Sequence, residues 1–185
     1  VSSVTIMSGM FKYCSNFNQP LANWDVSSVV NMARMFWGAS SFNQPLANWD
    51  VSNVERMQWL FALSGFNQDI SSWDVSSVLQ MDVMFHQSAF NQDISSWNVG
   101  NVTNMSNMFS GNTSFNQDVG LWDMSSVTNI YNMFTGATTF NQNIGNWNVS
   151  NVTVMGSLFK NANAFNQDLS SWCVTNIDSL PDDFS

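Results

Sequence analysis

Apolar residues recur along this chain with a period of 24 or 25 positions. Within residues 75–98 the apolar set is Val75, Val78, Met81, Met84, Phe85, Phe90, Ile94 and Trp97. The opening steps of three positions predict a short helix or 3₁₀ segment that turns one apolar stripe inward. The end of the repeat, Trp97-Asn98-Val99, alternates apolar and polar residues as a strand does. We therefore expect each repeat to combine a short strand around Trp-Asp-Val with a helical return path.

The tripeptide Phe-Asn-Gln marks the repeat, and a tryptophan follows each of its phenylalanines by seven positions. The tripeptide begins at Phe17, Phe42, Phe66, Phe90, Phe115, Phe140 and Phe165. So strict a period predicts stacked coils in which equivalent positions form columns. We predict a single solenoid array over residues 1–185, with coils 1–25, 26–50, 51–74, 75–98, 99–123, 124–148 and 149–173 and a partial coil 174–185. Because Val1 falls inside a coil, we expect the chain to be a fragment of a longer one.

The predicted fold class is a right-handed repeat solenoid of the α/β, leucine-rich-repeat type. Strands of successive coils would form a parallel sheet on one face, and short helical or 3₁₀ segments would cover the other. The coils 51–74 and 75–98 each lack one residue between their two phenylalanines. That interval is predicted to be a loop, because a deletion inside a strand would turn its side chains to the opposite face.

An asparagine occupies the same place in every Phe-Asn-Gln copy. The column consists of Asn18, Asn43, Asn67, Asn91, Asn116, Asn141 and Asn166. An amide buried at a coil corner can bond the backbone of its own and neighbouring turns. We predict a structural asparagine ladder, with ligand binding as the alternative.

A second column lies between Trp and Val and is expected to face solvent. It consists of Asp25, Asp50, Asp74, Asn98, Asp123 and Asn148, followed by Cys173. On a parallel sheet these side chains would stack about 4.8 Å apart on the concave face. Three interpretations stay open: a solvated polar face, a contact site for a protein or glycan, or a Ca²⁺ site built from carboxylate oxygens. A third column, which alternates Pro20 and Pro45 with Asp69 and Asp93, is typical of turns.

The charge balance narrows the possible partners. Only 9% of the residues are charged, and the net charge is −9. The four basic residues are Lys12, Arg34, Arg56 and Lys160. Nucleic-acid binding needs a basic footprint, which this composition does not supply. No apolar run approaches the roughly 20 residues that cross a bilayer, so no membrane insertion is expected within this segment.

Residues that could support catalysis are few. His86 is the single histidine, and its column is otherwise variable, so we expect neither a general base nor a zinc site there. Cys14 and Cys173 lie about six coils apart, beyond disulfide reach. We predict no enzyme activity and no cofactor. Trp37, Trp59, Val83 and Tyr131 break the polar convex face, and Trp59 with Val83 would form a contact patch there.

The repeated phrase resembles a known family. The stretch Ile70-Ser-Ser-Trp73-Asp-Val75-Ser-Ser-Val78 is similar to the leucine-rich-repeat pattern L-x-x-L-x-L-x-x, and Val102-Thr-Asn-Met105-Ser-Asn-Met108-Phe109 resembles the convex-side segment of BspA-like leucine-rich-repeat surface proteins. Trp, Met and Phe stand where Leu is usual. The resemblance spans essentially the whole chain. It implies a secreted or surface-anchored protein, and several members of this group are considered adhesins.

The leading functional prediction is a non-catalytic, extracellular or cell-surface interaction module of the adhesin type. It would bind a protein or glycan on a cell surface through the concave sheet. The alternative is a structural spacer, or a subunit of a surface filament or coat in which copies of the chain stack end to end.

Overall fold

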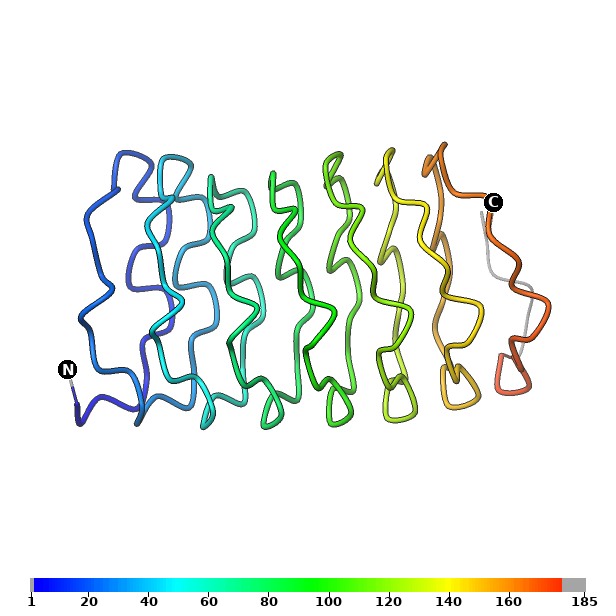
Figure 1. The fold of residues 1–185 in the computed structure, drawn as a ribbon, viewed down its shortest axis with the longest axis horizontal. Helices are drawn as coiled ribbons and strands as arrows, with labels where there is room; N and C mark the ends of the chain where they lie inside the picture. The colour runs from blue at the N-terminus through cyan, green and yellow to red at the C-terminus, as the bar shows by residue number, and fades with distance from the viewer. Residues whose placement is uncertain (1, 178–185) are drawn as a thin grey trace.

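The computed structural model describes residues 2–177, which wind through successive coils that lie side by side in a row (Figure 1). Within this range there is neither a helix nor an extended strand, and the chain consists of turns joined by irregular segments. Neighbouring coils are connected by isolated parallel bridges of one residue each. The bridges pair Ile6–Asn31, Asn31–Arg56, Arg56–Gln80, Gln80–Asn104, Asn104–Asn129 and Asn129–Val154.

The predicted α/β fold, with a parallel sheet and helical segments, is therefore wrong. In the segment expected to be helical, Leu60 donates its N–H to the carbonyl of Met57 at 3.1 Å, which closes a turn. Trp59 and Phe61, however, donate to the carbonyls of Asp82 and Met84 in the next coil. An α-helix needs each N–H to reach the carbonyl four residues earlier. The three-residue spacing of apolar positions came from consecutive turns.

Backbone torsions exclude a helix in the same segment. Two residues per coil, four positions apart, have φ between 49° and 72°, in the left-handed region. The first column is Gly9, Arg34, Trp59, Val83, Asn107, Asn132 and Ser157, and the second is Tyr13, Gly38, Leu63, Gln87, Gly111, Gly136 and Asn161. A right-handed helix requires φ near −63° at every residue. Each coil therefore changes direction twice over this segment.

The predicted strand around Trp-Asp-Val is also missing. Residues 71–72 and 76–77 form turns on either side of it, so three residues remain between the turns. The alternation of burial was predicted correctly, because Trp73 and Val75 are buried whereas Asp74 is exposed. Alternating polarity thus described which side chains enter the core but did not require a ladder of backbone hydrogen bonds.

The backbone ladder between coils lies instead along the segment expected to be helical. Met105, Asn107, Phe109 and Gly111 donate in turn to carbonyls of the next coil, at 2.7 to 3.0 Å. The residues between them close local turns, as Met108 does onto Met105 at 3.2 Å. Along this segment one N–H group bonds to the next coil and the following one closes a turn, in alternation. The buried backbone is thereby hydrogen-bonded without regular secondary structure.

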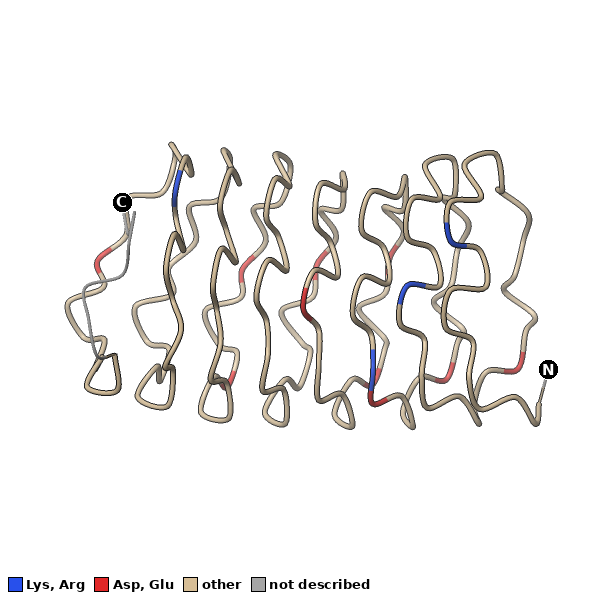
Figure 2. Ribbon diagram, turned by 180° about the vertical axis from the view of Figure 1, so that it is seen from behind, with Lys and Arg blue, Asp and Glu red and all other residues tan. Residues whose placement is uncertain are grey.

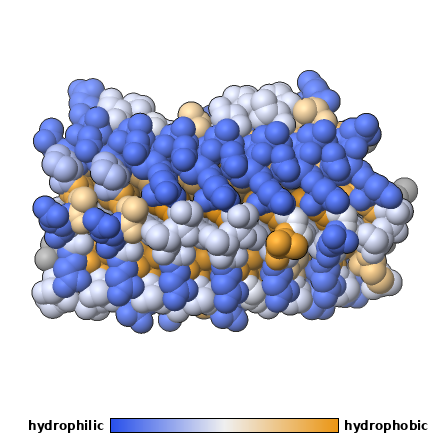
Figure 3. Space-filling view, in the orientation of Figure 1, coloured by the Kyte–Doolittle hydropathy of each residue, from blue (hydrophilic) through white to orange (hydrophobic). Residues whose placement is uncertain are grey.

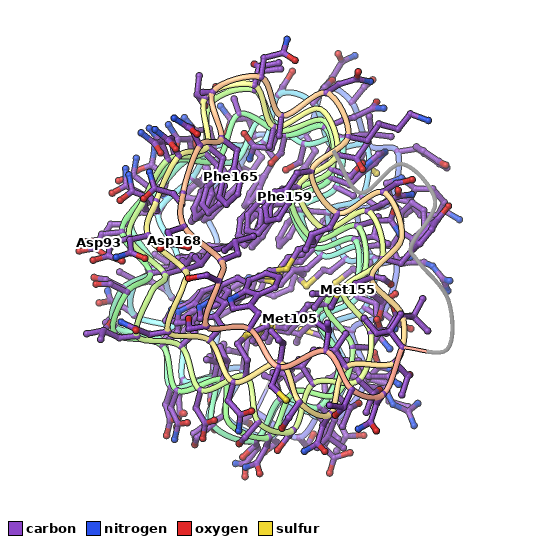
Figure 4. The ribbon with its side chains drawn as sticks, turned by 90° about the vertical axis from the view of Figure 1, so that its right-hand side faces the viewer. Asp93, Met105, Met155, Phe159, Phe165 and Asp168 are labelled. Atoms are coloured by element: carbon purple, nitrogen blue, oxygen red, sulfur yellow. The ribbon has the colours of Figure 1, made fainter. Side chains whose placement is uncertain are left out.

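The core consists of apolar columns that run the length of the stack. All eight positions predicted for residues 75–98 are at most 3% exposed. Phe85 stacks on Phe90 of its own coil at a centroid distance of 4.0 Å and on Phe109 of the next coil at 5.6 Å. In Figure 4, Phe159 and Phe165 point toward one another inside the ring of backbone. Burying each such side chain contributes roughly 1.5–3 kcal/mol.

The tryptophan column adds a buried polar connection between coils. The indole N–H of Trp73 donates to the carbonyl oxygen of Leu46 at 3.0 Å. Equivalent bonds are made by Trp49, Trp97, Trp122, Trp147 and Trp172. Each coil is therefore registered on the one before it by a directional bond inside an apolar core.

Candidate functional site

The asparagine column connects neighbouring coils at the surface. The N–H of Asn67 and the side-chain amide of Gln68 both donate to Oδ1 of Asn43, at 2.9 and 3.1 Å. The same backbone bond joins Asn18, Asn43, Asn67, Asn91, Asn116, Asn141 and Asn166 in sequence. These side chains are exposed or half-buried, not buried as expected. The glutamines of the tripeptide join the same network, so little of its bonding capacity points toward a ligand.

The Asp/Asn column between Trp and Val lies fully at the surface and closes turns. Oδ1 of Asp74 accepts a hydrogen bond from the N–H of Ser76 at 3.0 Å, and Oδ1 of Asn98 accepts one from Gly100 at 3.2 Å. The same arrangement occurs at Asp25, Asp50, Asp123 and Asn148. Because Oδ1 is common to both residue types, Asp and Asn serve this turn equally well.

Hydrogen bonding also affects the acidity of this column. Bonds from Ser76 to Asp74, and from Ser125 to Asp123, hold the pKa of each carboxyl below its ordinary value. The carboxylates are therefore charged and committed to turns at neutral pH. Ligand binding by this column stays a prediction, and the concave sheet on which it was placed does not exist.

The third column, after Phe-Asn-Gln, has the turn role predicted for it. Oδ1 of Asp69 accepts a bond from the N–H of Ser71 at 2.8 Å, and Asp93 and Asp168 do the same with Ser95 and Ser170. In Figure 4, Asp93 and Asp168 lie at the outer edge of the coils, away from the core.

Across residues 2–177, no group of three or more His, Cys, Asp or Glu side chains is arranged to hold a metal ion. Cys14 and Cys173 are both exposed free thiols. No helix long and apolar enough to cross a membrane occurs in the same range.

A ridge of rings interrupts the regular columns on the first four coils. We call Tyr13, Trp37, Trp59 and His86 the aromatic ridge. Centroid distances are 4.9 Å from Tyr13 to Trp37, 4.7 Å from Trp37 to Trp59 and 6.4 Å from Trp59 to His86. Lys12 places its Nζ 4.3 Å from the Trp37 ring centroid, within cation–π range. The ridge is therefore a continuous aromatic surface with a cation at one end.

Two polar atoms of the ridge are unsatisfied. Trp37 Nε1 and His86 Nδ1 are buried and have no hydrogen-bond partner. Burial also lowers the pKa of His86 below its ordinary value, against an opposing hydrogen bond to the backbone of Ser110. The imidazole is consequently uncharged at neutral pH. Unpaired buried polar atoms are uncommon in folded proteins, and Gln58, next to Trp59 in the chain, carries another at Oε1.

A hollow adjoins the ridge at Trp59. It encloses about 230 Å³ and is lined by Asn31, Ala33, Arg34, Arg56, Gln58, Trp59 and Asp82. A second hollow of about 280 Å³ shares Asn31 and Arg56 with it and adds Thr5, Ile6, Val30 and Glu55. We call the first hollow the basic groove, because both arginines of the chain line it, whereas the second hollow places Glu55 beside Arg56. Figure 2 views the stack from behind, and its basic segments lie mainly toward the N-terminal end.

The left-handed backbone positions two groove residues. Arg34 and Trp59 occupy the same column in successive coils, with φ of 62° and 60°. This column turns the chain at the surface, so both side chains emerge on the same face beside one another. Asp82 lines the same hollow, and burial raises the pKa of its carboxyl, with the charge of Arg34 opposing the rise.

The predicted contact patch of Trp59 and Val83 is not formed as expected. Val83 is only 7% exposed and so offers little contact surface, whereas Trp59 packs its ring against Trp37 and lies near His86. Sequence reasoning missed the ridge because its four members come from three columns, with only Trp37 and His86 in the same one. A signal was nevertheless present, since Trp37 and Trp59 are the two of nine tryptophans outside the periodic set.

Comparison with known proteins gives one family. The profile of a family described as "Mycoplasma protein of unknown function, DUF285" matches residues 1–89, 61–124 and 80–185, which together span the chain. No curated protein matches significantly. No solved structure does either.

Proposed function

The chain belongs to the DUF285 family of Mycoplasma proteins of unknown function, and we propose that it is a non-catalytic, extracellular interaction module of the adhesin type. The observation that carries the proposal is the aromatic ridge. It is a run of neighbouring rings on a surface whose asparagine and Asp/Asn columns are polar. The resemblance of the repeat to BspA-like surface proteins supports the extracellular setting.

Composition of the ridge favours a macromolecular contact. Trp, Tyr and Arg are the residues that most often dominate binding energy at interfaces. Here Tyr13 is 58% exposed, Trp59 is half-buried, and Arg34 lines the same hollow as Trp59. Rings already packed against one another lose little conformational freedom on binding, which favours affinity.

The remaining surface supports this choice by contrast. Figure 3 shows rows of hydrophilic side chains running along the front face of the stack. In the asparagine and Asp/Asn columns, Oδ1 of residues such as Asn43 and Asp74 is already occupied by bonds within the protein. A partner at those columns would compete with bonds that hold the coils and turns. The ridge presents no such conflict.

Non-catalytic binding also agrees with the chemistry available. His86 is half-buried, and burial disfavours its charged form. Within the described residues no cluster of His, Cys, Asp and Glu surrounds it. A general base or nucleophile requires such neighbours to orient and activate it.

The test measures binding of the fluorescently labelled chain to cultured epithelial cells. The double variant Tyr13→Asn/Trp59→Asn removes two ridge rings, and Asn fits both left-handed positions because Asn161 and Asn107 occupy the same columns. Tyr131→Ser is the control: it removes an exposed ring outside the ridge, and Ser106 is the equivalent residue one coil earlier. We expect at least about tenfold weaker binding for the double variant and native binding for the control.

Two results would overturn the proposal. If the native chain does not bind the cultured cells, the proposed interaction role is wrong. Equal binding by the native chain and by a folded double variant removes the ridge from it. Circular dichroism and thermal unfolding of each variant separate loss of binding from loss of structure.

A further inference from the structure

The basic groove concentrates positive charge on an otherwise acidic protein. The chain carries thirteen acidic and four basic residues, yet both of its arginines line one hollow of about 230 Å³. Asp82 is the only acidic side chain lining that hollow, so the charge of its lining is positive even when Asp82 is ionised. An anionic group approaching this protein is therefore attracted to the groove and repelled by most of the remaining surface.

Trp59 gives the groove one apolar wall. Its ring lies between Trp37, 4.7 Å away, and His86, 6.4 Å away, and it also lines the hollow. The electron-rich face of an indole attracts partly positive C–H groups and cations. A pyranose ring carries such C–H groups on one face and hydroxyls around its rim, so it can stack on the indole and still reach polar neighbours.

Polar side chains in the groove offer both donors and acceptors. Asn31 presents its amide N–H groups, since its Oδ1 accepts from the N–H of Ala33. Gln58 presents an amide, Asp82 a carboxyl group, and the two arginines guanidinium donors. Oε1 of Gln58 is buried and has no hydrogen-bond partner, while its Nε2 donates to Gln80 of the next coil. Because Oε1 is buried, a ligand hydroxyl reaches it only if the Gln58 amide turns toward the hollow; the hydroxyl would then satisfy an atom that an apolar ligand could not.

We propose that the basic groove binds a carboxylate-bearing saccharide, with its ring stacked on Trp59 and its carboxylate held by Arg34 and Arg56. This inference rests on the proposed interaction function and names the ligand class for it. Guanidinium groups bind carboxylates through paired, charge-assisted hydrogen bonds, which a neutral sugar cannot accept. The amides and Asp82 then bind the hydroxyls. Two sources supply this chemistry, sialic acids and uronic acids.

In the test, the native chain is titrated with 3′-sialyllactose, with a hyaluronan tetrasaccharide and with lactose. Tryptophan fluorescence and isothermal titration calorimetry measure each dissociation constant. The variant Arg34→Asn/Arg56→Gln removes both guanidinium groups and inserts residues found in the same columns, at Asn107 and Gln80. Lys160→Ser inserts the residue type that Ser110 supplies in the same column, and it removes a positive charge outside the groove. We expect at least one acidic saccharide to bind about tenfold more tightly than lactose. The arginine variant should lose that preference, and Lys160→Ser should keep it.

Binding of 3′-sialyllactose would identify a sialic acid as the ligand, and binding of the hyaluronan tetrasaccharide would identify a uronic acid. Preferential binding of either one over lactose supports the proposal. Binding of lactose as tightly as both acidic saccharides, or an unchanged preference in the folded arginine variant, overturns it. Absence of saccharide binding also overturns it, and the cell-binding assay then separates the two ideas. Cell binding that still depends on Tyr13 and Trp59 leaves the interaction module standing, whereas loss of all cell binding removes both.

Discussion

The indole N–H of Trp97 donates a hydrogen bond to the carbonyl oxygen of Ile70, 3.1 Å away and 27 residues earlier in the chain. Both groups are buried, so the bond is made where water cannot replace it. It joins one coil to the preceding one, as the phenylalanine stacks do. Periodic residues thus hold the coils together, whereas Trp37 and Trp59 of the ridge lie outside the periodic tryptophan set and make no such indole bond to a neighbouring coil within residues 2–177.

Substitution of Trp97 tests the strength of this connection. We expect Trp97→Phe to lower the free energy of unfolding by about 2 kcal/mol, because the Ile70 carbonyl loses its partner inside the core. Urea unfolding measures the change. The same substitution at Trp24, which lies in the first coil and is only half-buried, should cost less. Equal losses at the two sites would show that the buried indole bond contributes little.

Gly136 tests the left-handed column. Its φ is 69°, and a Cβ placed there would come no closer than 3.6 Å to its neighbours, so the space is open. Gly136→Ala should still lower the free energy of unfolding by about 1–2 kcal/mol, because L-residues are disfavoured in this region. Gly100→Ala serves as the control: its φ is not in the left-handed region, and the equivalent residues Ser76 and Ser125 carry a Cβ and donate the same turn bond. Thermal unfolding compares them, and a neutral Gly136→Ala would contradict the torsional argument.

Asp74 tests whether its column serves the turns. Asp74→Asn keeps the oxygen that accepts from Ser76, as Asn98 shows one coil later, so it should leave stability unchanged at neutral pH. Asp74→Ala removes the acceptor and should cost about 1 kcal/mol. Urea unfolding of the two variants separates the hydrogen bond from the charge. A loss in Asp74→Asn as large as in Asp74→Ala would assign the effect to charge.

Acid should destabilise the stack through the same turns. Hydrogen bonds to the serine two residues later lower the pKa of Asp69 and Asp93 in the folded state, below the ordinary value of 3.8. The stabilisation is therefore present above that value and is lost as the pH falls through the folded pKa. We expect the melting temperature to drop between about pH 4 and pH 2.5. Asp69→Asn combined with Asp93→Asn should flatten the drop, and an unaltered profile would exclude these two groups as its cause.

The sequence predicted burial far better than it predicted backbone geometry. The eight apolar positions of residues 75–98 all enter the core because side-chain hydrophobicity is a property of single residues. Helix and strand were wrong because steps of three and alternating residues also arise in consecutive turns. The left-handed torsions that decide the matter fall on Trp59 and Val83, residue types that rarely adopt them.

The candidate site was even less visible in the sequence. Columns were found by comparing equivalent positions, and this comparison is blind to contacts between unlike positions. Trp37 and Trp59 differ by 22 residues, not 24 or 25, and they meet only because neighbouring coils place them on one surface. Arg34 and Asp82 belong to coils two apart and share a hollow for the same reason.

One comparison tests the central claim most directly: binding of three chains to the same cells, measured side by side. They are the native chain, the ridge variant Tyr13→Asn/Trp59→Asn, and the column variant Asp50→Asn/Asp74→Asn/Asp123→Asn. If the aromatic ridge is the contact surface, the ridge variant should bind the cells at least about tenfold more weakly than the native chain. The column variant should bind with the native affinity. Loss of binding in the column variant, with native binding by a folded ridge variant, would contradict it and place the contact on the Asp/Asn column.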